Sequence, residues 1–201
     1  VDSEAVGGGV RDGGAALVID ATQSLGALPF DVAAIQPDFL IAACYKWLMG
    51  PYSIGFTYVA PRWQDGRPLE YGWIQRRGSE KFAGLVNYRD DYQPGARRYD
   101  VGERSNFALI PAAQAALDQI AEWGIDNIQT TLSARSNAIA ERARDLGLSS
   151  APQGLRAGHF LGLGFAGGVP DGLADQLARH NVYVSVRGQN SMRITPHVYN
   201  T

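Results

Sequence analysis

This sequence of 201 residues has a single cysteine, no long apolar run and a small net charge. A single cysteine, Cys44, excludes an internal disulfide framework and favours a reducing compartment. No apolar run approaches the roughly 20 residues that a membrane-spanning helix needs, and the start shows no signal-peptide pattern. The net charge of -2 gives no electrostatic case for nucleic acid or an acidic membrane surface. These absences predict a soluble, cytoplasmic protein that binds neither nucleic acid nor a membrane.

The apolar share of the sequence, 45%, is enough for a real core, and the length suits one full domain or two small ones. Residues 1–14 are rich in glycine and are predicted to form a loop that leads into a central strand. Residues 54–59 alternate modestly and are predicted to form a further strand. Val1 is not an initiator methionine, and a remnant of two or three strands would leave sheet edges unpaired. We therefore interpret the chain as a fragment that lacks both ends.

Two short apolar runs end next to residues that carry chemistry. The run Phe39–Ala43 is typical of a parallel strand buried on both faces, and Lys46 follows it. The run 15–19 ends in Asp20, and there is room between the two runs for a turn and a short helix that Asp31 caps. This is the spacing of a compact crossover between parallel strands. Asp20 and Lys46 are therefore predicted to lie at carboxyl ends of parallel strands, where open α/β sheets bind ligands.

Lys46 is predicted to lie among aromatic and aliphatic residues. Such surroundings remove water from its ammonium group and favour the free amine, which is a nucleophile toward a carbonyl carbon. The alternative is a lysine whose stem lies along the sheet edge and whose head stays in water. An amine and a carboxylate on one edge suit an aldehyde cofactor with a ring nitrogen, such as pyridoxal 5'-phosphate (PLP). Lys46 would hold the aldehyde as a Schiff base, and Asp20 would keep the pyridine nitrogen protonated.

Three motifs carry a resemblance to a known family. They are Leu17–Gly26 (LVIDATQSLG), Tyr45–Pro51 (YKWLMGP) and Met192–Thr201 (MRITPHVYNT). With these motifs the sequence closely resembles the class V aminotransferase family, a PLP-dependent family of fold type I, over nearly its whole length. That family includes cysteine desulfurases, selenocysteine lyases, kynureninases, isopenicillin epimerase-like proteins and several transaminases.

The resemblance implies an α/β protein with two parts. Residues 1–106 would be the C-terminal part of a PLP-binding large domain with a mainly parallel sheet, including an irregular connecting segment at 62–106. Residues 107–201 would be a small α/β C-terminal domain, truncated at its end. Apolar periodicity predicts two helices in it, at 109–123 and 126–147. The family also implies a homodimer with sites shared between the subunits.

The resemblance assigns cofactor contacts to several residues besides Asp20. Gln23 would lie beside the phenolic oxygen of PLP, although a polar loop residue is an equal alternative. Tyr45 would bind the phosphate through its hydroxyl. Trp73 would reach the phosphate of the neighbouring subunit. Ser105 would supply a hydroxyl equivalent to that of a Gly-Thr turn, but Ser105 or the next residue is also a candidate cap for the following helix.

The implied substrate is an amino acid. Lys46 would be displaced by it and would then move the α-proton as an acid and base. Arg193 would hold the α-carboxylate with its planar fork. His197 either orients Arg193 or packs in the core. Cys44 is not a candidate for sulfur transfer, because a buried cysteine beside a strand end lacks the exposure and mobility that a persulfide carrier needs.

The alternatives belong to other classes of protein. Gly162–Gly167 formally satisfies the dinucleotide fingerprint of an oxidoreductase, but these glycines fall inside a strand predicted at 159–165. A helix at 171–180 and a strand at 182–186 complete that predicted unit. No residues have metal-ligand spacing. A catalytically incomplete fragment or an interaction module remains open, and transamination, lyase and racemase chemistry are not distinguished.

Overall fold

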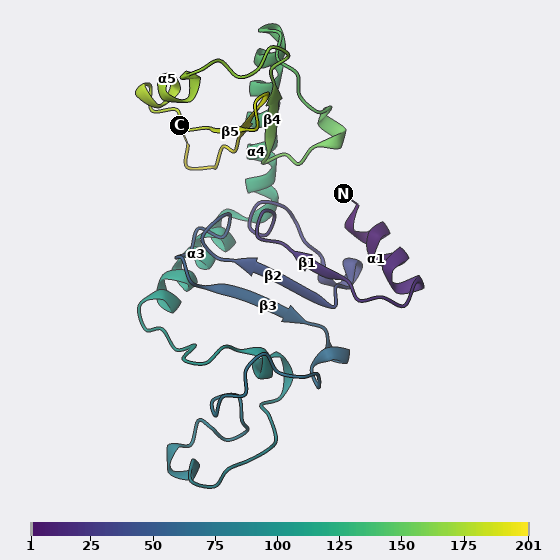
Figure 1. The fold of residues 1–201 in the computed structure, drawn as a ribbon, viewed down its shortest axis with the longest axis vertical. Helices are drawn as coiled ribbons and strands as arrows, with labels where there is room; N and C mark the ends of the chain where they lie inside the picture. The colour runs from purple at the N-terminus through teal and green to yellow at the C-terminus, as the bar shows by residue number, and fades with distance from the viewer. Residues whose placement is uncertain (1, 201) are drawn as a thin grey trace. The chain divides into compact units, whose positions relative to one another are not determined.

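The computed structural model describes residues 2–200, and its first sheet is built around one parallel crossover (Figure 1). β1 (Val18–Asp20) pairs in parallel with β2 (Phe39–Ala43), and α2 (Val32–Ile35) lies between them in the chain. The Asp31 carboxylate caps α2 by accepting hydrogen bonds from two amides of its first turn, at 2.7 and 3.2 Å. The predicted crossover and its cap are therefore confirmed.

β3 (Gly55–Val59) runs antiparallel to β2, so the sheet, in the order β1-β2-β3, is mixed. The prediction of a mainly parallel sheet is wrong for these three strands. The connection at 44–54 contains no helix, and a parallel return needs a crossover of about a dozen residues or more. Burial on both faces of β2 is wrong too, because Leu40 is buried while Ile41 on the other face is 39% exposed.

The glycine-rich start is a helix, α1 (Ser3–Asp12), and the predicted loop is wrong there. Asp2 caps α1, because its carboxylate accepts a hydrogen bond from the amide of Ala5, the third residue of α1, at 3.0 Å. Gly7 is buried, and a Cβ added to it would lie 2.7 Å from the carbonyl oxygen of Ile35. The cap and the close contact with α2 offset part of the cost of glycine in a helix, about 1 kcal/mol per residue.

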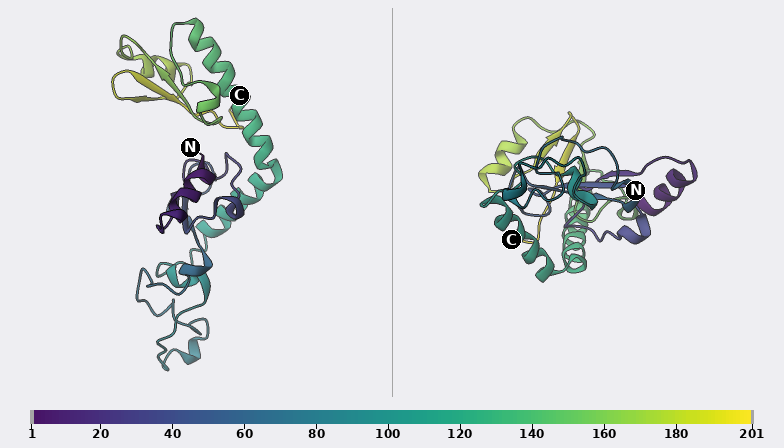
Figure 2. Two further views of the ribbon diagram at one scale, coloured as in Figure 1. Left: turned by 90° about the vertical axis from the view of Figure 1, so that its right-hand side faces the viewer. Right: turned by 90° about the horizontal axis from the view of Figure 1, so that it is seen from below.

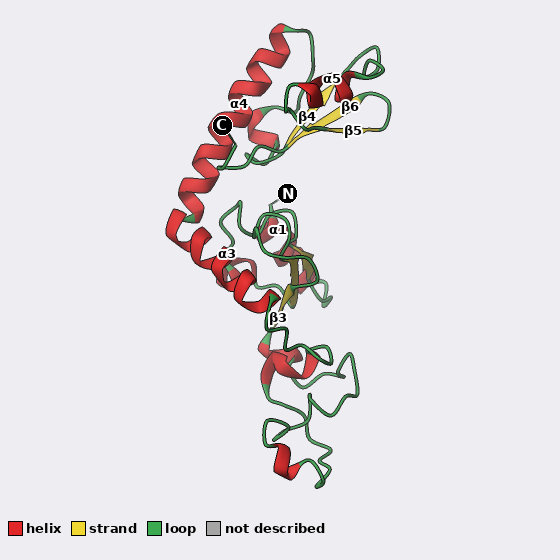
Figure 3. Ribbon diagram, turned by 90° about the vertical axis from the view of Figure 1, so that its left-hand side faces the viewer, coloured by secondary structure: helices red, strands yellow, loops and turns green. Residues whose placement is uncertain are grey.

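An irregular segment follows β3 and is almost wholly loop (Figure 3). It holds three short 3-10 turns and is tied together by arginine side chains, such as that of Arg76, whose guanidinium lies 4.1 Å from the ring centroid of Tyr92. The helix predicted at 109–123 is confirmed as α3 (Leu109–Trp123). The turns are η1 (Pro61–Trp63), η2 (Phe82–Gly84) and η3 (Gly95–Tyr99).

The remaining residues build a second, antiparallel sheet in the order β4-β6-β5 beside a long helix (Figure 2). Its core forms where Ala140 and Ala143 of that helix pack on Leu161 and Leu163. The four predicted elements are present, with bounds that differ by a few residues, as α4 (Ile125–Asp145), β4 (Leu161–Gly164), α5 (Leu173–Arg179) and β5 (Ser185–Arg187). The unit also contains η4 (Gln153–Leu155) and β6 (Ser191–Ile194).

The chain divides into two compact units. The first holds the residues up to Gly26 together with Phe30–Glu122, and the second holds Ala27–Pro29 with Trp123 and the residues after it. The predicted domain boundary after residue 106 concerns the longer fold and stays a prediction. Among residues 2–200, no helix combines the length and the apolar character that crossing a bilayer requires.

Candidate active site

Asp20 and Lys46 leave the same edge of the first sheet. Asp20 is the last residue of β1 and pairs with Ile41 of β2, and the Ala21 amide continues the ladder by donating to the Ile41 carbonyl oxygen at 2.7 Å. Lys46 follows the end of β2 in a tight turn and is half-buried. Because β1 and β2 are parallel, their carboxyl ends meet at one edge, and the predicted placement of the acid and the amine is confirmed.

The Asp20 carboxylate is exposed and is held in its charged form. Hydrogen bonds from the Thr22 hydroxyl and from the Thr22 amide, the latter 2.9 Å from Oδ1, lower the pKa of Asp20 below its ordinary value. The positive charge of Lys46 also lowers the pKa of Asp20. At neutral pH this edge therefore offers an ionised carboxylate to a ligand.

Thr22 is a residue to which the sequence interpretation assigned no role. Its Oγ1 accepts a hydrogen bond from the amide of Ala43, the last residue of β2, at 3.0 Å. Its amide forms the bond to Asp20 Oδ1 described above, which is the geometry of an Asx turn. A hydroxyl residue two positions after an aspartate at a predicted strand end is the sequence pattern that could have indicated this turn.

The turn that carries Lys46 is closely packed. The Gly50 amide donates to the Cys44 carbonyl oxygen at 2.9 Å, and the Met49 amide donates to the Lys46 carbonyl oxygen at 3.0 Å. A Cβ added to Gly50 would collide with Cys44 Sγ, so this position requires glycine. Cys44 has an exposed fraction of 0%, and its burial raises the pKa of its thiol. The turn is thus closely packed, and its thiol is buried and favours the protonated form.

Tyr45 and Gln23 belong to the same edge. The Tyr45 ring stacks on that of Tyr52, with a centroid distance of 4.3 Å and an interplanar angle of 17°. Lys46 Nζ lies 5.6 Å from the centroid of the Tyr45 ring, so an aromatic face does adjoin the amine, as predicted. Gln23 is exposed one residue beyond Thr22. The contacts of Tyr45 with a phosphate and of Gln23 with a phenolic oxygen stay predictions.

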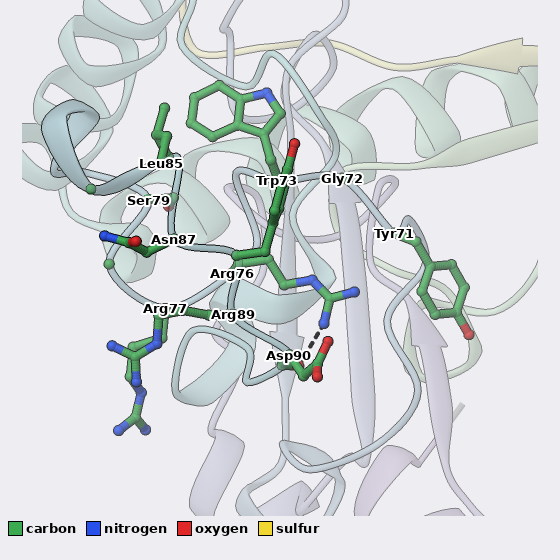
Figure 4. Close-up of a pocket in the computed structure, with 13 residues that line it drawn as sticks. Tyr71, Gly72, Trp73, Arg76, Arg77, Ser79, Leu85, Asn87, Arg89 and Asp90 are labelled. Carbon is green, nitrogen blue, oxygen red and sulfur yellow. Dashed lines mark hydrogen bonds between the residues drawn. The ribbon is translucent and has the colours of Figure 1, made fainter.

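Trp73 lies in the irregular segment, where it lines a cavity of about 590 Å³ (Figure 4). Its side chain is 45% exposed, and Arg76 in the same cavity donates a hydrogen bond to the Asp90 carbonyl oxygen at 2.5 Å. β3 ends at Val59, which pairs with the first residue of β2, so the segment leaves the sheet at the end opposite Lys46. Within one chain, Trp73 therefore does not join the Asp20–Lys46 edge.

Ser105 is exposed just before α3, and it is not the helix cap. The Asn106 side chain takes that role, because its Oδ1 accepts hydrogen bonds from the amides of Ala108 and Leu109 at 3.1 and 2.9 Å. The alternative that Asn106 caps the helix is confirmed. The contact of Ser105 with a phosphate stays a prediction.

Arg193 lies on β6 in the second unit, with small neighbours on both sides. It pairs with Gly162 on β4 and with Ser185 on β5, and an added Cβ on Gly162 would meet no atom within 4 Å. Its guanidinium lies 5.3 Å from the ring centroid of Phe160. The half-buried Arg193 therefore has open space on its face of the sheet, which suits a carboxylate ligand.

His197 is packed in the core of the second unit. It is 5% exposed, and its ring stacks on that of Tyr199 at a centroid distance of 4.4 Å. Burial, aided by the positive charge of Arg135, lowers the pKa of His197. Arg135 also donates to the His197 carbonyl oxygen at 2.6 Å. Of the two predicted roles, the structure favours the packed core histidine.

The glycine pattern at 162–167 lies in a structure that differs from a dinucleotide-binding site. Gly162 and Gly164 lie within β4, whose neighbour β6 runs antiparallel, whereas a dinucleotide fingerprint needs a βαβ unit with its glycines at the start of the helix. The structure therefore opposes the dinucleotide alternative. Among residues 2–200, no cluster of three or more His, Cys, Asp or Glu side chains is arranged to hold a metal ion.

Solved structures define the class of fold. A cysteine desulfurase from Thermococcus onnurineus NA1 superposes with a TM-score of 0.83 at 23% identity, covering 100% of this chain and 52% of that one. A variant of C-DES with glycine covalently linked to its PLP cofactor superposes with a TM-score of 0.75 at 18% identity, covering 91% of this chain and 47% of that one. At these identities the likeness establishes the fold, which is that of about half of a PLP enzyme of fold type I.

Sequence comparison gives the family. The family model for aminotransferase class-V matches residues 2–201, and the chain belongs to that family. The uncharacterized aminotransferase YcbU of Bacillus subtilis (strain 168) is 29% identical over 196 residues, which are 94% of this chain and 48% of that protein. A probable cysteine desulfurase of Pyrococcus abyssi is 39% identical over 128 residues, 63% of this chain and 30% of that protein. The chain thus spans about half the length, or less, of these curated relatives.

Proposed function

We propose that this chain supplies the lysine and the acid of a PLP-dependent active site that acts on an amino-acid substrate. The observation that carries the proposal is the meeting of Asp20 and Lys46 at one sheet edge, with the Asp20 carboxylate exposed and ionised. The C-DES variant, a protein of the same fold, carries a PLP cofactor to which glycine is covalently linked, and this supports the proposal. When bound, PLP supplies an electron sink for a carbanion at the substrate's α-carbon.

The residues at this edge fit such a cofactor. The Lys46 amine would hold its aldehyde carbon, and the Asp20 carboxylate would pair with its protonated ring nitrogen. The Gln23 amide and the Tyr45 hydroxyl, on the same edge, would donate to its oxygen atoms. Lys46 is half-buried beside the Tyr45 ring, so it is partly shielded from water, whereas Asp20 is open to a ligand.

Two side chains would act on the substrate. Arg193 would bind the α-carboxylate through its planar fork, in the open space beside Gly162. Lys46 Nζ would take the substrate's α-proton and hold it. Transferase, lyase and racemase chemistry share the binding of the carboxylate and the removal of this proton, so we propose the substrate class and the proton removal. The buried Cys44 would take no part in sulfur transfer.

A homodimer with shared sites is part of the proposal. Trp73 is exposed, and the segment that contains it leaves the sheet at the end opposite Lys46. This supports a contact of Trp73 with the phosphate of a neighbouring subunit. Subunit complementation tests it. A mixture of Lys46→Ala and Trp73→Ala chains would form mixed dimers with one intact site, and activity would return although each variant alone is inactive. No recovery in demonstrably mixed dimers would contradict the shared site.

The chain offers a matched control for cofactor binding, because its two lysines are Lys46 and Lys81. We expect the full protein to develop a visible absorption band with PLP that borohydride bleaches. Lys46→Ala would abolish the band, and Lys81→Ala, at an exposed position, would keep it. Product analysis over a panel of amino acids would then give the reaction type. A wild-type protein without the band would favour the alternative, a catalytically incomplete fragment or interaction module.

A further inference from the structure

Thr22 connects Asp20, the last residue of β1, to β2, the strand that precedes Lys46. Its Oγ1 accepts from the amide of Ala43, which ends β2 three residues before Lys46, at 3.0 Å. Its own amide donates to Asp20 Oδ1 at 2.9 Å. Thr22 therefore bridges the carboxyl ends of β1 and β2 at the candidate active site, with its amide bonded to Asp20 and its hydroxyl oxygen bonded to Ala43.

The direction of these hydrogen bonds leaves one donor on Thr22. A hydroxyl has one proton and two lone pairs, and the Ala43 amide can only donate, so it occupies a lone pair. The hydroxyl proton is thereby left for the neighbouring Asp20 carboxylate, and the Thr22 side chain is the first cause that lowers the pKa of Asp20. With this proton on the carboxylate, an amide, a hydroxyl and a carboxylate would form a chain in which each hydrogen bond polarises the next.

We propose that Thr22 is a positioning residue, whose hydroxyl fixes the Asp20 carboxylate against the strand that leads to Lys46. Asp20 is an exposed side chain at the end of a three-residue strand, so its own packing leaves its orientation free. The hydrogen bond from the Thr22 amide to Oδ1 restricts that freedom, and the bond from the Ala43 amide to Thr22 Oγ1 fixes the same residue to β2. The catalytic meaning of this bridge rests on the proposed function, whereas the bridge itself does not.

Two variants of Thr22 distinguish the effect of its hydroxyl group from the effect of its side-chain shape. Thr22→Val keeps the branched side chain and removes the hydroxyl, and Thr22→Ser keeps the hydroxyl and removes the methyl group. The first test is an NMR titration of the Asp20 carboxyl carbon in the full protein without PLP. The pKa of Asp20 is expected to rise toward its ordinary value in Thr22→Val and to stay low in Thr22→Ser. A pKa that is unchanged in a folded Thr22→Val variant, or raised equally in both, would overturn the proposal.

A double-mutant cycle asks whether Thr22 acts through Asp20. We expect Thr22→Val to weaken PLP binding about tenfold in the wild-type background, since a hydrogen bond to a charged group is lost. In an Asp20→Asn background the same substitution should change binding less than about twofold, because the carboxylate is already gone. Equal losses in both backgrounds would reduce Thr22 to a purely structural role. Absence of PLP binding in the wild type would refute the proposed function, and the titration would still decide the bridge.

Discussion

Replacing Asp38 by alanine is expected to lower the free energy of unfolding by about 3 kcal/mol, chiefly because a buried backbone amide loses its acceptor. Asp38 precedes β2 and is 1% exposed. Its Oδ2 accepts from the Leu17 amide at 2.7 Å, and its Oδ1 accepts from Arg62 Nε and Trp63 Nε1, both at 2.6 Å. One carboxylate thus joins the start of β2 to the residue before β1 and to η1.

The partners of Asp38 differ in how well water can replace it. The Leu17 amide is buried, and an unsatisfied buried donor costs about 1–3 kcal/mol. Trp63 is 38% exposed, so its indole N–H recovers part of its hydration. The Arg62 side chain is 57% exposed, and the loss of such a pair costs about 0–1 kcal/mol. Loss of the acceptor for the buried Leu17 amide, together with part of the cost at the Trp63 indole, is therefore expected to lower the free energy of unfolding more than loss of the ion pair with Arg62.

Urea unfolding of three proteins tests this ranking. Asp38→Ala should lose about 3 kcal/mol, and Arg62→Ala, the matched control that removes the charge and hydrogen bond of Arg62 but keeps the acceptor of the Leu17 amide, should lose less than about 1 kcal/mol. An Arg62→Ala variant as unstable as Asp38→Ala would refute the reasoning, because the ion pair would then dominate.

The pH dependence of stability gives an independent check on Asp38. Burial raises the pKa of Asp38, but hydrogen bonds from Leu17, Trp63 and Arg62, with the Arg62 charge, outweigh it and lower the pKa below the ordinary 3.8. A group with a lowered folded pKa stabilises the fold above its unfolded pKa, and this contribution is lost as the pH falls through the folded value. Wild type should therefore lose stability below pH 3.8 more steeply than Asp38→Ala. Parallel pH profiles would contradict the assignment.

Three further substitutions or reagents probe the site. Gly50→Ala should cost about 1–3 kcal/mol by forcing a Cβ against Cys44 Sγ, and an unchanged melting temperature would contradict that packing. The Cys44 thiol should resist a thiol reagent in the native protein and react once in denaturant, because it is buried with a raised pKa; rapid native labelling would show that this account of the turn is wrong. Arg193→Lys should raise KM for the amino acid about tenfold by replacing the planar fork with a point charge, and an unchanged KM would remove Arg193 from the substrate site.

Local patterns in the sequence predict the part of the site that the first unit builds. An apolar run before Asp20, another before Lys46 and a capping Asp31 between them were sufficient to predict the parallel crossover, because each signal depends on neighbouring residues. The helices α3 and α4 followed from their apolar stripes in the same way.

Contacts between distant residues account for what the sequence did not show. α1 forms despite its glycines because Gly7 allows close approach to Ile35, which no local pattern records. β3 returns antiparallel to β2 through the short connection at 44–54, which contains no crossover helix. The bridge of Thr22 to Ala43 joins residues 21 positions apart, and it becomes apparent only when β1 and β2 are paired.

Peptide mapping after borohydride reduction of the PLP-treated protein tests the central claim most directly. If the Lys46 amine and the Asp20 carboxylate form the cofactor site, reduction will leave one pyridoxyl group per chain, on the peptide that contains Lys46, and Asp20→Ala will diminish it. The exposed Lys81 will stay unlabelled at the same PLP concentration. Equal labelling of Lys46 and Lys81, unaffected by Asp20→Ala, would contradict the claim, because it would show two ordinary surface amines.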